Sequence, residues 1–198
     1  MSDAETSVGG LRCLQAPARI ETARLVVRAV EEADIAALVE VNQDDSVTQY
    51  LPYASWRSLD DGMAWLQRMR KLEATGTGVQ LAILEKHSGR AIGTSLLFRH
   101  EAASARAELG YVLGRRHWGQ RLMHEALAAI VAQVFIAGAL RRLEAEVNPL
   151  NGASCRVLER LGFRHEGLLR QRWVAKGATY DTSLYGLLRD EWRPADIV

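Results

Sequence analysis

The sequence predicts a mixed α/β (α+β) domain with a central sheet of about seven strands flanked by helices. Two observations predict it. Three strand patterns follow one another within residues 79–113, so neighbouring strands can pair as hairpins. A long helical pattern then separates them from a further strand, a helix and a final pair of strands, which gives the element order βααβββαβαββ.

The first element begins after residues 1–19, which are mostly small or polar and show little periodicity. We expect this segment to be a mobile N-terminal extension. Leu25, Val26 and Val27 suit the first strand. Because no repeat or long linker interrupts residues 20–193, we expect these residues to form a single domain.

Two helices are expected before the next strand. Residues 33–41 repeat apolar side chains at helical spacing. The second helix is expected to start at Ser58, whose hydroxyl can cap the first turn, with Asp61 as the reciprocal acceptor of a capping box. It continues to Gly76.

The middle of the chain is expected to form three strands, at residues 79–85, 91–98 and 105–113. The first two flank His87-Ser88-Gly89-Arg90, a glycine-containing hairpin signal. The long helix at residues 119–137 follows and is expected to end near Gly138.

The C-terminal part begins with a short strand at residues 142–147, which Asn148-Pro149 ends. A compact helix at residues 151–161 is closed by Gly162. The last two strands are expected at residues 163–174 and 179–188, joined around Lys176-Gly177.

Composition restricts the class of protein. The chain has 198 residues, 48% of them hydrophobic, and a formal net charge of +1, which gives no general attraction to nucleic acid or to an anionic membrane. It has no apolar run of about 18 residues and no signal-peptide pattern, so we expect a cytoplasmic protein with neither a membrane nor a nucleic-acid partner. Its cysteines and histidines lack metal-ligand spacing, and no metal is expected.

Residues 108–127 are the most informative segment, because a strand pattern passes through a basic, glycine-bearing turn directly into a helix. The first turn of a helix leaves backbone N–H groups without intrahelical partners and carries partial positive charge. Such a strand–turn–helix is an anion site suited to phosphate. Arg121 stands in the turn where a small residue is expected.

Three blocks of sequence carry a resemblance to a known family. They are Glu108-Leu109-Gly110-Tyr111, then Trp118-Gly119-Gln120-Arg121-Leu122-Met123 with Glu125-Ala126, then Asn148-Pro149-Leu150-Asn151-Gly152-Ala153-Ser154 running to Glu159-Arg160-Leu161-Gly162-Phe163. Together they resemble the GNAT acetyltransferase superfamily, specifically its RimJ/RimL-like branch, which is associated with acetylating protein N-termini and small amines. The resemblance covers almost the whole chain from Ile20 to Trp192. It implies the GNAT fold and acetyl-CoA as co-substrate.

The resemblance implies that the turn binds the pyrophosphate of coenzyme A through Trp118, Gly119, Gln120, Arg121, Leu122 and Met123. The family's turn usually reads R/Q-G-x-G-x-G/A, so Arg121 replaces the middle glycine. Two outcomes are open. If the local backbone is helical, Arg121 can swing away or bind the phosphate through its guanidinium. If a positive φ is needed, coenzyme A binding is weakened.

The resemblance also implies the reaction, in which an amine attacks the acetyl thioester directly and a strand N–H polarises the thioester carbonyl. Val112 or Leu113 would provide that N–H. The attacking amine must be neutral, so a nearby base is useful. Glu108 is the carboxylate of this strand and our candidate for the base. The alternative is a solvated or salt-bridged residue near Arg106.

The third block supplies the other half of the site. Asn148 and Asn151 lie where their side chains could bind the pantetheine arm, although Asn151 could instead cap the next helix. In the resembling branch a serine at the position of Ser154 can protonate the departing thiolate. The alternative for Ser154 is a hydroxyl bonded to its own helix backbone.

The acceptor site is expected beside an aromatic-rich segment at residues 50–56. Tyr50 and Trp56 could frame an amine there, or they could equally be core residues. Trp65, at helical spacing, is expected in the core. Asp181 near the last hairpin could attract an ammonium group or simply satisfy a turn.

Two functions follow from these patterns. The first is an acetyl-CoA-dependent N-acetyltransferase that acts on a peptide N-terminus or a small amine in a ternary complex. The alternative, motivated by Arg121, is a non-catalytic GNAT-shaped sensor of acyl-CoA or another phosphate ligand. An exposed sheet edge is compatible with either a monomer or a homodimer.

Overall fold

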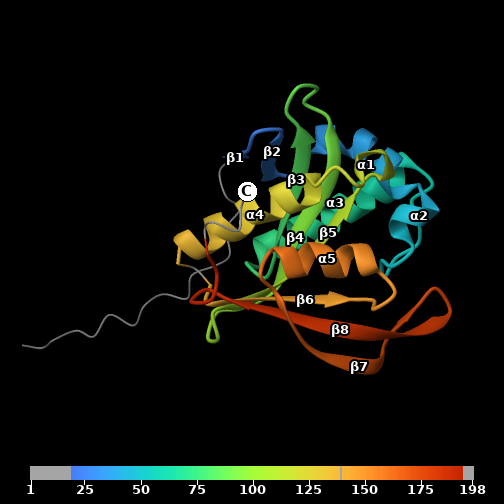
Figure 1. Cartoon of the computed structure of the whole chain (residues 1–198). Coiled ribbons are helices and arrows are strands. Elements are labelled where there is room, and N and C mark those ends of the chain that lie inside the picture. Colours follow the sequence, from blue (N-terminus) through green and yellow to red (C-terminus); the bar gives the residue numbers. More distant parts are fainter. Residues whose placement is uncertain (1–18, 139, 194–198) are drawn as a thin grey trace, which may run out of the picture.

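The computed structural model describes residues 19–138 and 140–193, which form one eight-stranded sheet with helices on both faces (Figure 1). The strand order is β1-β2-β3-β4-β5-β6-β8-β7. Strands β5 and β6 pair in parallel, and the other neighbouring strands pair antiparallel. The predicted mixed α/β class is confirmed.

The expected elements are present, with four additions that were too short to leave a periodic pattern in the sequence. These are strand β1, helix α2 and two single 3₁₀ turns at Glu32–Asp34 and Arg115–His117. The expected N-terminal extension falls, apart from Arg19, outside the described residues. The elements are β1 (Ile20–Glu21), β2 (Leu25–Ala29), α1 (Ile35–Asn42), α2 (Asp45–Thr48), α3 (Leu59–Ala74), β3 (Val79–Glu85), β4 (Ala91–Glu101), β5 (Arg106–Leu113), α4 (Leu122–Ile136), β6 (Arg142–Val147), α5 (Gly152–Arg160), β7 (Arg164–Ala175) and β8 (Ala178–Leu188).

Helices α1 and α3 cover one face of the sheet. Ser58 caps α3 as predicted: its hydroxyl accepts from Asp61 N at 3.3 Å, and the Asp61 carboxylate accepts from Ser58 N at 3.0 Å. Apolar side chains of both helices, including Leu38 and Leu66, are buried against Leu84 and its neighbours on the sheet. Burial of this apolar face stabilises the two helices on the sheet.

Helices α4 and α5 cover the opposite face, where the larger core lies (Figure 1). Leu127 and Ile130 of α4 are fully buried against alternate residues of the central strands, such as Leu81 and Ile83. Because successive strand residues point to opposite faces, the two cores use interleaved positions of the same strands.

The two parallel strands separate beyond Glu108. They pair from Arg106↔Arg142 to Glu108↔Glu144, after which β5 stays paired with β4 as far as Leu113. Strand β6 stays paired with β8 as far as Val147. The separated ends lead into the loops before α4 and α5, and this arrangement opens the sheet where two helices begin.

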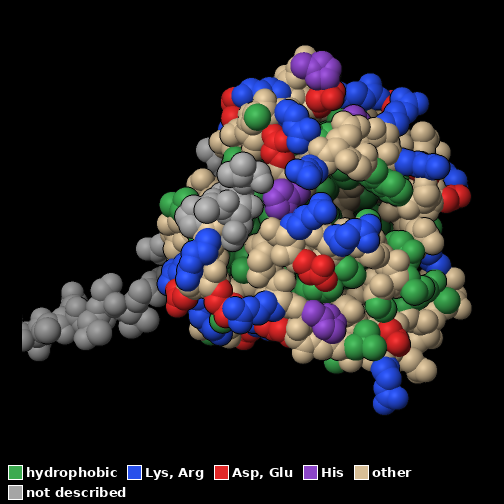
Figure 2. All heavy atoms as spheres, in the orientation of Figure 1, with side chains coloured by type: hydrophobic (Ala, Val, Ile, Leu, Met, Phe, Trp, Pro, Cys, Tyr) green, Lys and Arg blue, Asp and Glu red, His purple; other side chains and the backbone are tan. Residues whose placement is uncertain are grey.

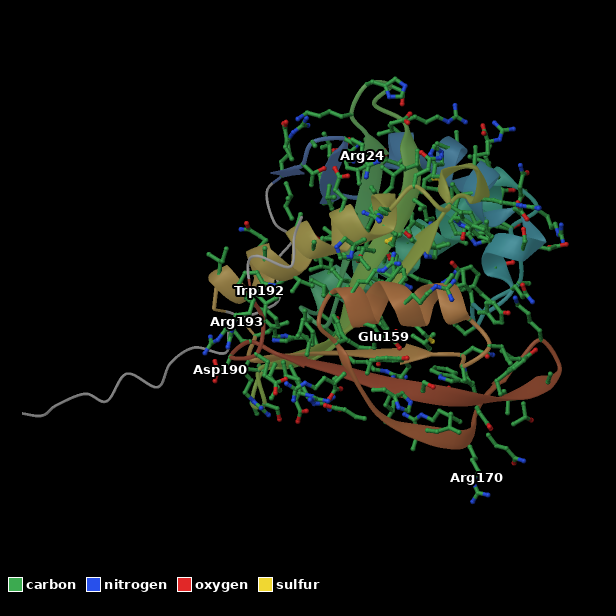
Figure 3. All side chains as sticks on the ribbon, in the orientation of Figure 1. Arg24, Glu159, Arg170, Asp190, Trp192 and Arg193 are labelled. Carbon is green, nitrogen blue, oxygen red and sulfur yellow. The ribbon has the colours of Figure 1, made fainter. Side chains whose placement is uncertain are left out.

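Strands β6, β8 and β7 form one end of the molecule (Figure 1). The predicted turn between β7 and β8 is present: Lys176 and Gly177 both have positive φ, 52° and 77°, as a two-residue hairpin turn requires. Strand β7 is an edge strand with mostly exposed side chains, and Arg170 points away from the sheet in Figure 3.

Candidate active site

A cavity of about 990 Å³ lies where β5 and β6 separate. Its walls come from both faces of the sheet, because it is lined by Glu108 and Glu146 on the α3 side and by Ser154 on the α5 side. Figure 2 shows a hollow on the face of the molecule where α4 and α5 lie, with Lys and Arg side chains gathered around it. The cavity therefore opens to both faces of the sheet, and its rim on the α4 and α5 side is basic.

The turn before α4 forms one edge of the cavity. Trp118 Nε1 donates to Leu113 O at 2.7 Å, and Gln120 Nε2 donates to Arg116 O at 3.0 Å, so side chains fix the turn from inside. Helix α4 begins at Leu122, and its first backbone bond runs from Glu125 N to Arg121 O at 3.0 Å. The N-cap residue, Arg121, makes no side-chain capping bond at this end of α4. Its first-turn N–H groups thus provide a site for an anion.

Arg121 has a left-handed backbone, with φ 61° and ψ 12°. Gly119 in the same turn is also left-handed, at φ 74°. The turn therefore keeps the conformation that a glycine would favour, at a cost of about 1–2 kcal/mol for an L-residue. The Arg121 side chain is exposed and lies at the cavity wall.

Arg24 holds the turn through hydrogen bonds of its guanidinium group. Its Nε lies 2.7 Å from Glu125 Oε2 and its Nη1 donates to Gln120 O at 3.1 Å. The Arg24 backbone N–H and the Thr22 hydroxyl donate to Glu125 Oε1 at 2.9 and 2.5 Å. Glu125 is a carboxylate in the first turn of α4, and Arg24 compensates its negative charge. The bonds from Thr22 and Arg24 hold the pKa of Glu125 below its ordinary value against the effect of burial.

The strand before the turn presents a backbone N–H to the opening. Gly114 N donates to Ile92 O on β4. Because successive residues of a strand point their N–H groups in opposite directions, Val112 faces β4 and Leu113 faces away from it, toward the separated β6. Of the two residues predicted to polarise a carbonyl, Leu113 has the suitable orientation.

Ser154 and Tyr111 form a hydroxyl pair on the α5 side of the cavity. The two oxygens are 2.6 Å apart, and Tyr111 also donates to Ser154 O at 3.3 Å. Burial raises the pKa of Tyr111 well above its usual range, so its hydroxyl stays protonated at neutral pH. The Ser154 hydroxyl is thus bonded to Tyr111 of β5 rather than to the backbone of its own helix, α5.

The two asparagines of this loop use their side-chain oxygens locally. Asn151 Oδ1 accepts from Ser154 N at 3.1 Å and caps α5, and Asn148 Oδ1 accepts from Leu150 N at 2.9 Å. Both side chains also line the cavity. Their amide NH₂ groups remain as potential donors toward a ligand.

Glu108 lies on the other face of the sheet, almost buried, with 10% of its side chain exposed. Arg99 Nη1 donates to Glu108 Oε2 at 2.7 Å and to Glu146 Oε1 at 3.1 Å. Burial raises the pKa of Glu108 above its ordinary value, and Arg99 opposes that rise. A carboxylate with a raised pKa is better matched to accept a proton near neutral pH.

Of the two tryptophans considered for the acceptor side, Trp65 lies in the core as expected, and Trp56 takes the core alternative rather than a place at the cavity. Trp56 is buried in the core, 5.3 Å from the Trp65 ring centroid, and it is not among the residues that line the cavity. Trp65 lines the cavity, although it is also 7% exposed and packed in the core. Trp56 precedes α3 and Trp65 lies within it, so the sequence could not show that the two indoles pack together or which of them lines the cavity.

Tyr50 and Asp181 do lie at the cavity, and each also makes a structural bond. Tyr50 Oη donates to Leu150 O at 3.3 Å, and Asp181 Oδ1 accepts from Gln171 N at 2.8 Å. Lys176 Nζ donates to Thr48 O at 2.6 Å. The loop after α2 is therefore tied across the cavity to the β7–β8 turn and to the loop before α5.

A family model described as the acetyltransferase (GNAT) domain matches residues 24–164. This chain belongs to the GNAT acetyltransferase family. An uncharacterized N-acetyltransferase, p20, of Bacillus licheniformis is 33% identical over 86% of this chain and 96% of its own length. The [ribosomal protein uS5]-alanine N-acetyltransferase of Escherichia coli is 26% identical over 89% and 93% of the two chains. The solved structure of Mycobacterium smegmatis RimJ in complex with CoA-disulfide has 25% identity and a TM-score of 0.77, covering 84% of this chain and 83% of RimJ.

These relatives confirm the predicted resemblance to GNAT N-acetyltransferases with RimJ/RimL-like homologues. The protein is an N-acetyltransferase by family. Within residues 19–138 and 140–193 we find no cluster of side chains suited to a metal ion. In the same residues no helix combines the length and apolarity that crossing a membrane requires.

Sequence reasoning missed four side chains of this acetyltransferase's cavity region: Arg24, Arg99, Tyr111 and Glu146. Tyr111 was inside a quoted motif but had no partner until the fold placed Ser154 beside it. Glu146 could have been found from the alternation of β6, which puts it on the same face as Glu144. The sequence pattern of β4 did not indicate Arg99, because a β-bulge turns its side chain toward Glu108.

Proposed function

We propose that this protein transfers the acetyl group of acetyl-CoA directly to a primary amine in a ternary complex. The observation that carries the proposal is the separation of β5 from β6 beyond Glu108, with an anion-binding turn on one side and a buried carboxylate on the other. A thioester bound between β5 and β6 would lie between the turn before α4 and the Glu108 carboxylate. This arrangement supports direct transfer, since no cysteine lines the cavity in the described residues.

Coenzyme A fits the residues on the α4 and α5 side. Its pyrophosphate would lie at the turn formed by Trp118–Met123, where N–H groups and the exposed Arg121 provide positive charge. Its pantetheine arm would run between β5 and β6, with the amide groups of Asn148 and Asn151 as donors. The left-handed backbone of Arg121 preserves the close approach that the turn requires.

The proposed chemistry forms one C–N bond and breaks one C–S bond. The neutral amine attacks the acetyl carbon, and the Leu113 N–H stabilises the negative charge that develops on the carbonyl oxygen. Glu108 takes the proton that the amine loses, directly or through a water. Ser154, backed by the Tyr111 hydroxyl, gives a proton to the departing thiolate.

The acceptor would approach past Trp65 of α3, in the cavity that Tyr50 and Asp181 also line. An aromatic wall and a carboxylate suit an ammonium group with an apolar neighbour. The RimJ/RimL-like relatives favour a protein N-terminus, and a small amine is the other candidate.

The sequence left open that a positive φ at Arg121 would weaken coenzyme A binding, and the backbone there does have a positive φ. The sensor alternative nevertheless has less support, because its motive was the loss of the turn and the arginine adopts the conformation that a glycine would take. The turn has a left-handed backbone at that residue despite the arginine. We therefore infer that the turn can still receive a pyrophosphate.

Thiol release from acetyl-CoA tests the proposed function. The protein is screened with peptides of varied first residue, polyamines and aminoglycosides, and each product is identified by mass spectrometry. Intersecting initial-rate patterns against both substrates are expected for a ternary complex. Parallel patterns or a protein-bound acetyl group would contradict direct transfer, and the Glu108→Gln variant should lose most of the rate.

A further inference from the structure

Arg99 is the only described arginine that bonds both Glu108 and Glu146, two cavity carboxylates whose side chains are each 10% exposed. We propose that Arg99 is a positioning residue: it keeps Glu108 ionised and aimed in the protein that awaits its acceptor. The proposal rests on the proposed role of Glu108 as the base. It adds the residue that sets when that base is available.

The backbone of β4 is shaped to bring Arg99 to this place. Strand β4 pairs Phe98↔Glu108 and then Glu101↔Arg106, so one extra residue is accommodated in a bulge between them. Arg99 has a left-handed φ of 50°. In a regular strand Phe98 and Arg99 would point to opposite faces, whereas the bulge turns the Arg99 side chain to the Glu108 face.

Four strands meet at the Arg99 guanidinium. Its central carbon lies 5.5 Å from the Phe98 ring of β4 and 5.6 Å from the Trp173 ring of β7. Glu108 of β5 and Glu146 of β6 accept its hydrogen bonds. A planar guanidinium suits this combination of ring faces and carboxylates better than an ammonium does.

Glu146 is itself fixed, so it can anchor Arg99. Trp173 Nε1 donates to Glu146 Oε2 at 2.7 Å, and Arg172 Nη2 lies 3.2 Å from Glu146 Oε1. These partners hold the pKa of Glu146 below its ordinary value in spite of burial. Glu146 therefore stays ionised and leaves Arg99 as the cation shared with Glu108.

The charges around Glu108 explain why Arg99 is needed. The charged groups around Glu108 are Arg99 of β4 and the two glutamates of β6, Glu144 and Glu146. Burial and both glutamates favour the protonated form of Glu108, and Arg99 favours the ionised form. A base must be deprotonated before it can accept the amine proton. Without Arg99, Glu108 would take up a proton at higher pH and its deprotonated form would be lost first at the acidic end.

A carboxyl titration by NMR tests this directly, with protein carrying ¹³C at the glutamate side-chain carboxyls and the Glu108→Gln spectrum used for assignment. We expect the Glu108 midpoint to rise by about one to three pH units in Arg99→Met, as loss of an adjacent opposite charge does. Arg99→Lys should give an intermediate midpoint. Equal midpoints in wild-type protein and folded Arg99→Met would overturn the proposal.

Arg172→Gln is the matched control. It removes a cation from Glu146 but none from Glu108, so the Glu108 midpoint should stay close to that of wild type. A shift as large as that of Arg99→Met would contradict a specific role for Arg99. If Arg99→Met fails to fold by its melting curve, the Arg99→Lys midpoint decides, and a midpoint identical to wild type then counts against the proposal.

Activity separates this inference from the proposed function. The acidic limb of kcat/KM should move upward in Arg99→Met by the same amount as the NMR midpoint. If the midpoint moves while Glu108→Gln keeps full activity, Arg99 does control Glu108 but Glu108 is not the base. If Glu108→Gln is inactive and the midpoint does not move, the base assignment stands and the role of Arg99 fails.

Discussion

Arg24 and Glu125 join the start of β2 to the first turn of α4 through a side-chain ion pair, with Arg24 Nη2 2.7 Å from Glu125 Oε2. The same arginine donates to Gln120 O, the carbonyl just before the left-handed Arg121. A residue 96 positions away thus supports the turn proposed to bind the pyrophosphate.

Arg24→Gln should therefore weaken acetyl-CoA binding. Glu125 would keep its negative charge beside the anion site while the turn loses its support. We expect the KM for acetyl-CoA to rise about tenfold, as loss of one charged hydrogen bond does. The KM of the acceptor should change little. Arg164→Gln breaks an exposed ion pair with Glu191 far from the turn, and initial rates should show no such change for it.

Substitutions of Arg121 should follow backbone preference rather than charge alone. Arg121→Gly keeps a residue that accepts positive φ, so the Kd for acetyl-CoA should stay within about threefold of wild type. Arg121→Val places a β-branched residue in a conformation that such residues avoid, and the Kd should rise more than about tenfold. Calorimetry on both variants checks this pair. Equal affinities for the glycine and valine variants would contradict the importance of the left-handed turn.

The Tyr111–Ser154 pair should act as one unit. Tyr111→Phe and Ser154→Ala each break the 2.6 Å contact, so each should lower kcat by a factor on the order of ten while the KM for acetyl-CoA stays near its wild-type value. The double variant should be little worse than either single variant, because the second change removes nothing further. Fully additive losses in kcat would mean that the two hydroxyls act separately.

Gly93 is required by the close approach of β4 to β5. A Cβ at this residue would overlap the carbonyl oxygen of Val112 and lie 3.1 Å from Leu113 Cα, so backbone would have to move. Gly93→Ala should lower the free energy of unfolding by about 1–3 kcal/mol and reduce kcat by displacing Leu113. At Gly110 a Cβ would meet only the Phe98 ring, at 3.5 Å. Gly110→Ala should therefore unfold in denaturant almost as wild type does.

Local patterns predicted most of the fold because the hydrophobic periodicity of this chain agrees with its packing. The Ser58 capping box, the β7–β8 turn and β6 are present as predicted, since each depends on residues close together in sequence. Strand β1 and helix α2 were missed because two or four residues cannot display a period.

The site was less predictable, since its main contacts join distant residues. The carbonyl just before Arg121 accepts from Arg24, which precedes β2, and the Ser154 hydroxyl partner lies 43 residues away on β5. Arg99 reaches Glu108 only through a β-bulge, which alternation along the strand does not predict. The sequence motifs therefore indicated the segments that form the site, and the hydrogen-bond partners of their side chains became clear only in the folded structure.

Calorimetric titration of the protein with acetyl-CoA tests the central claim most directly. If the turn with its left-handed Arg121 receives the pyrophosphate, one molecule should bind per chain with a Kd on the order of micromolar, and binding should weaken with salt as charge contacts do. No heat at millimolar acetyl-CoA with folded protein would contradict the claim.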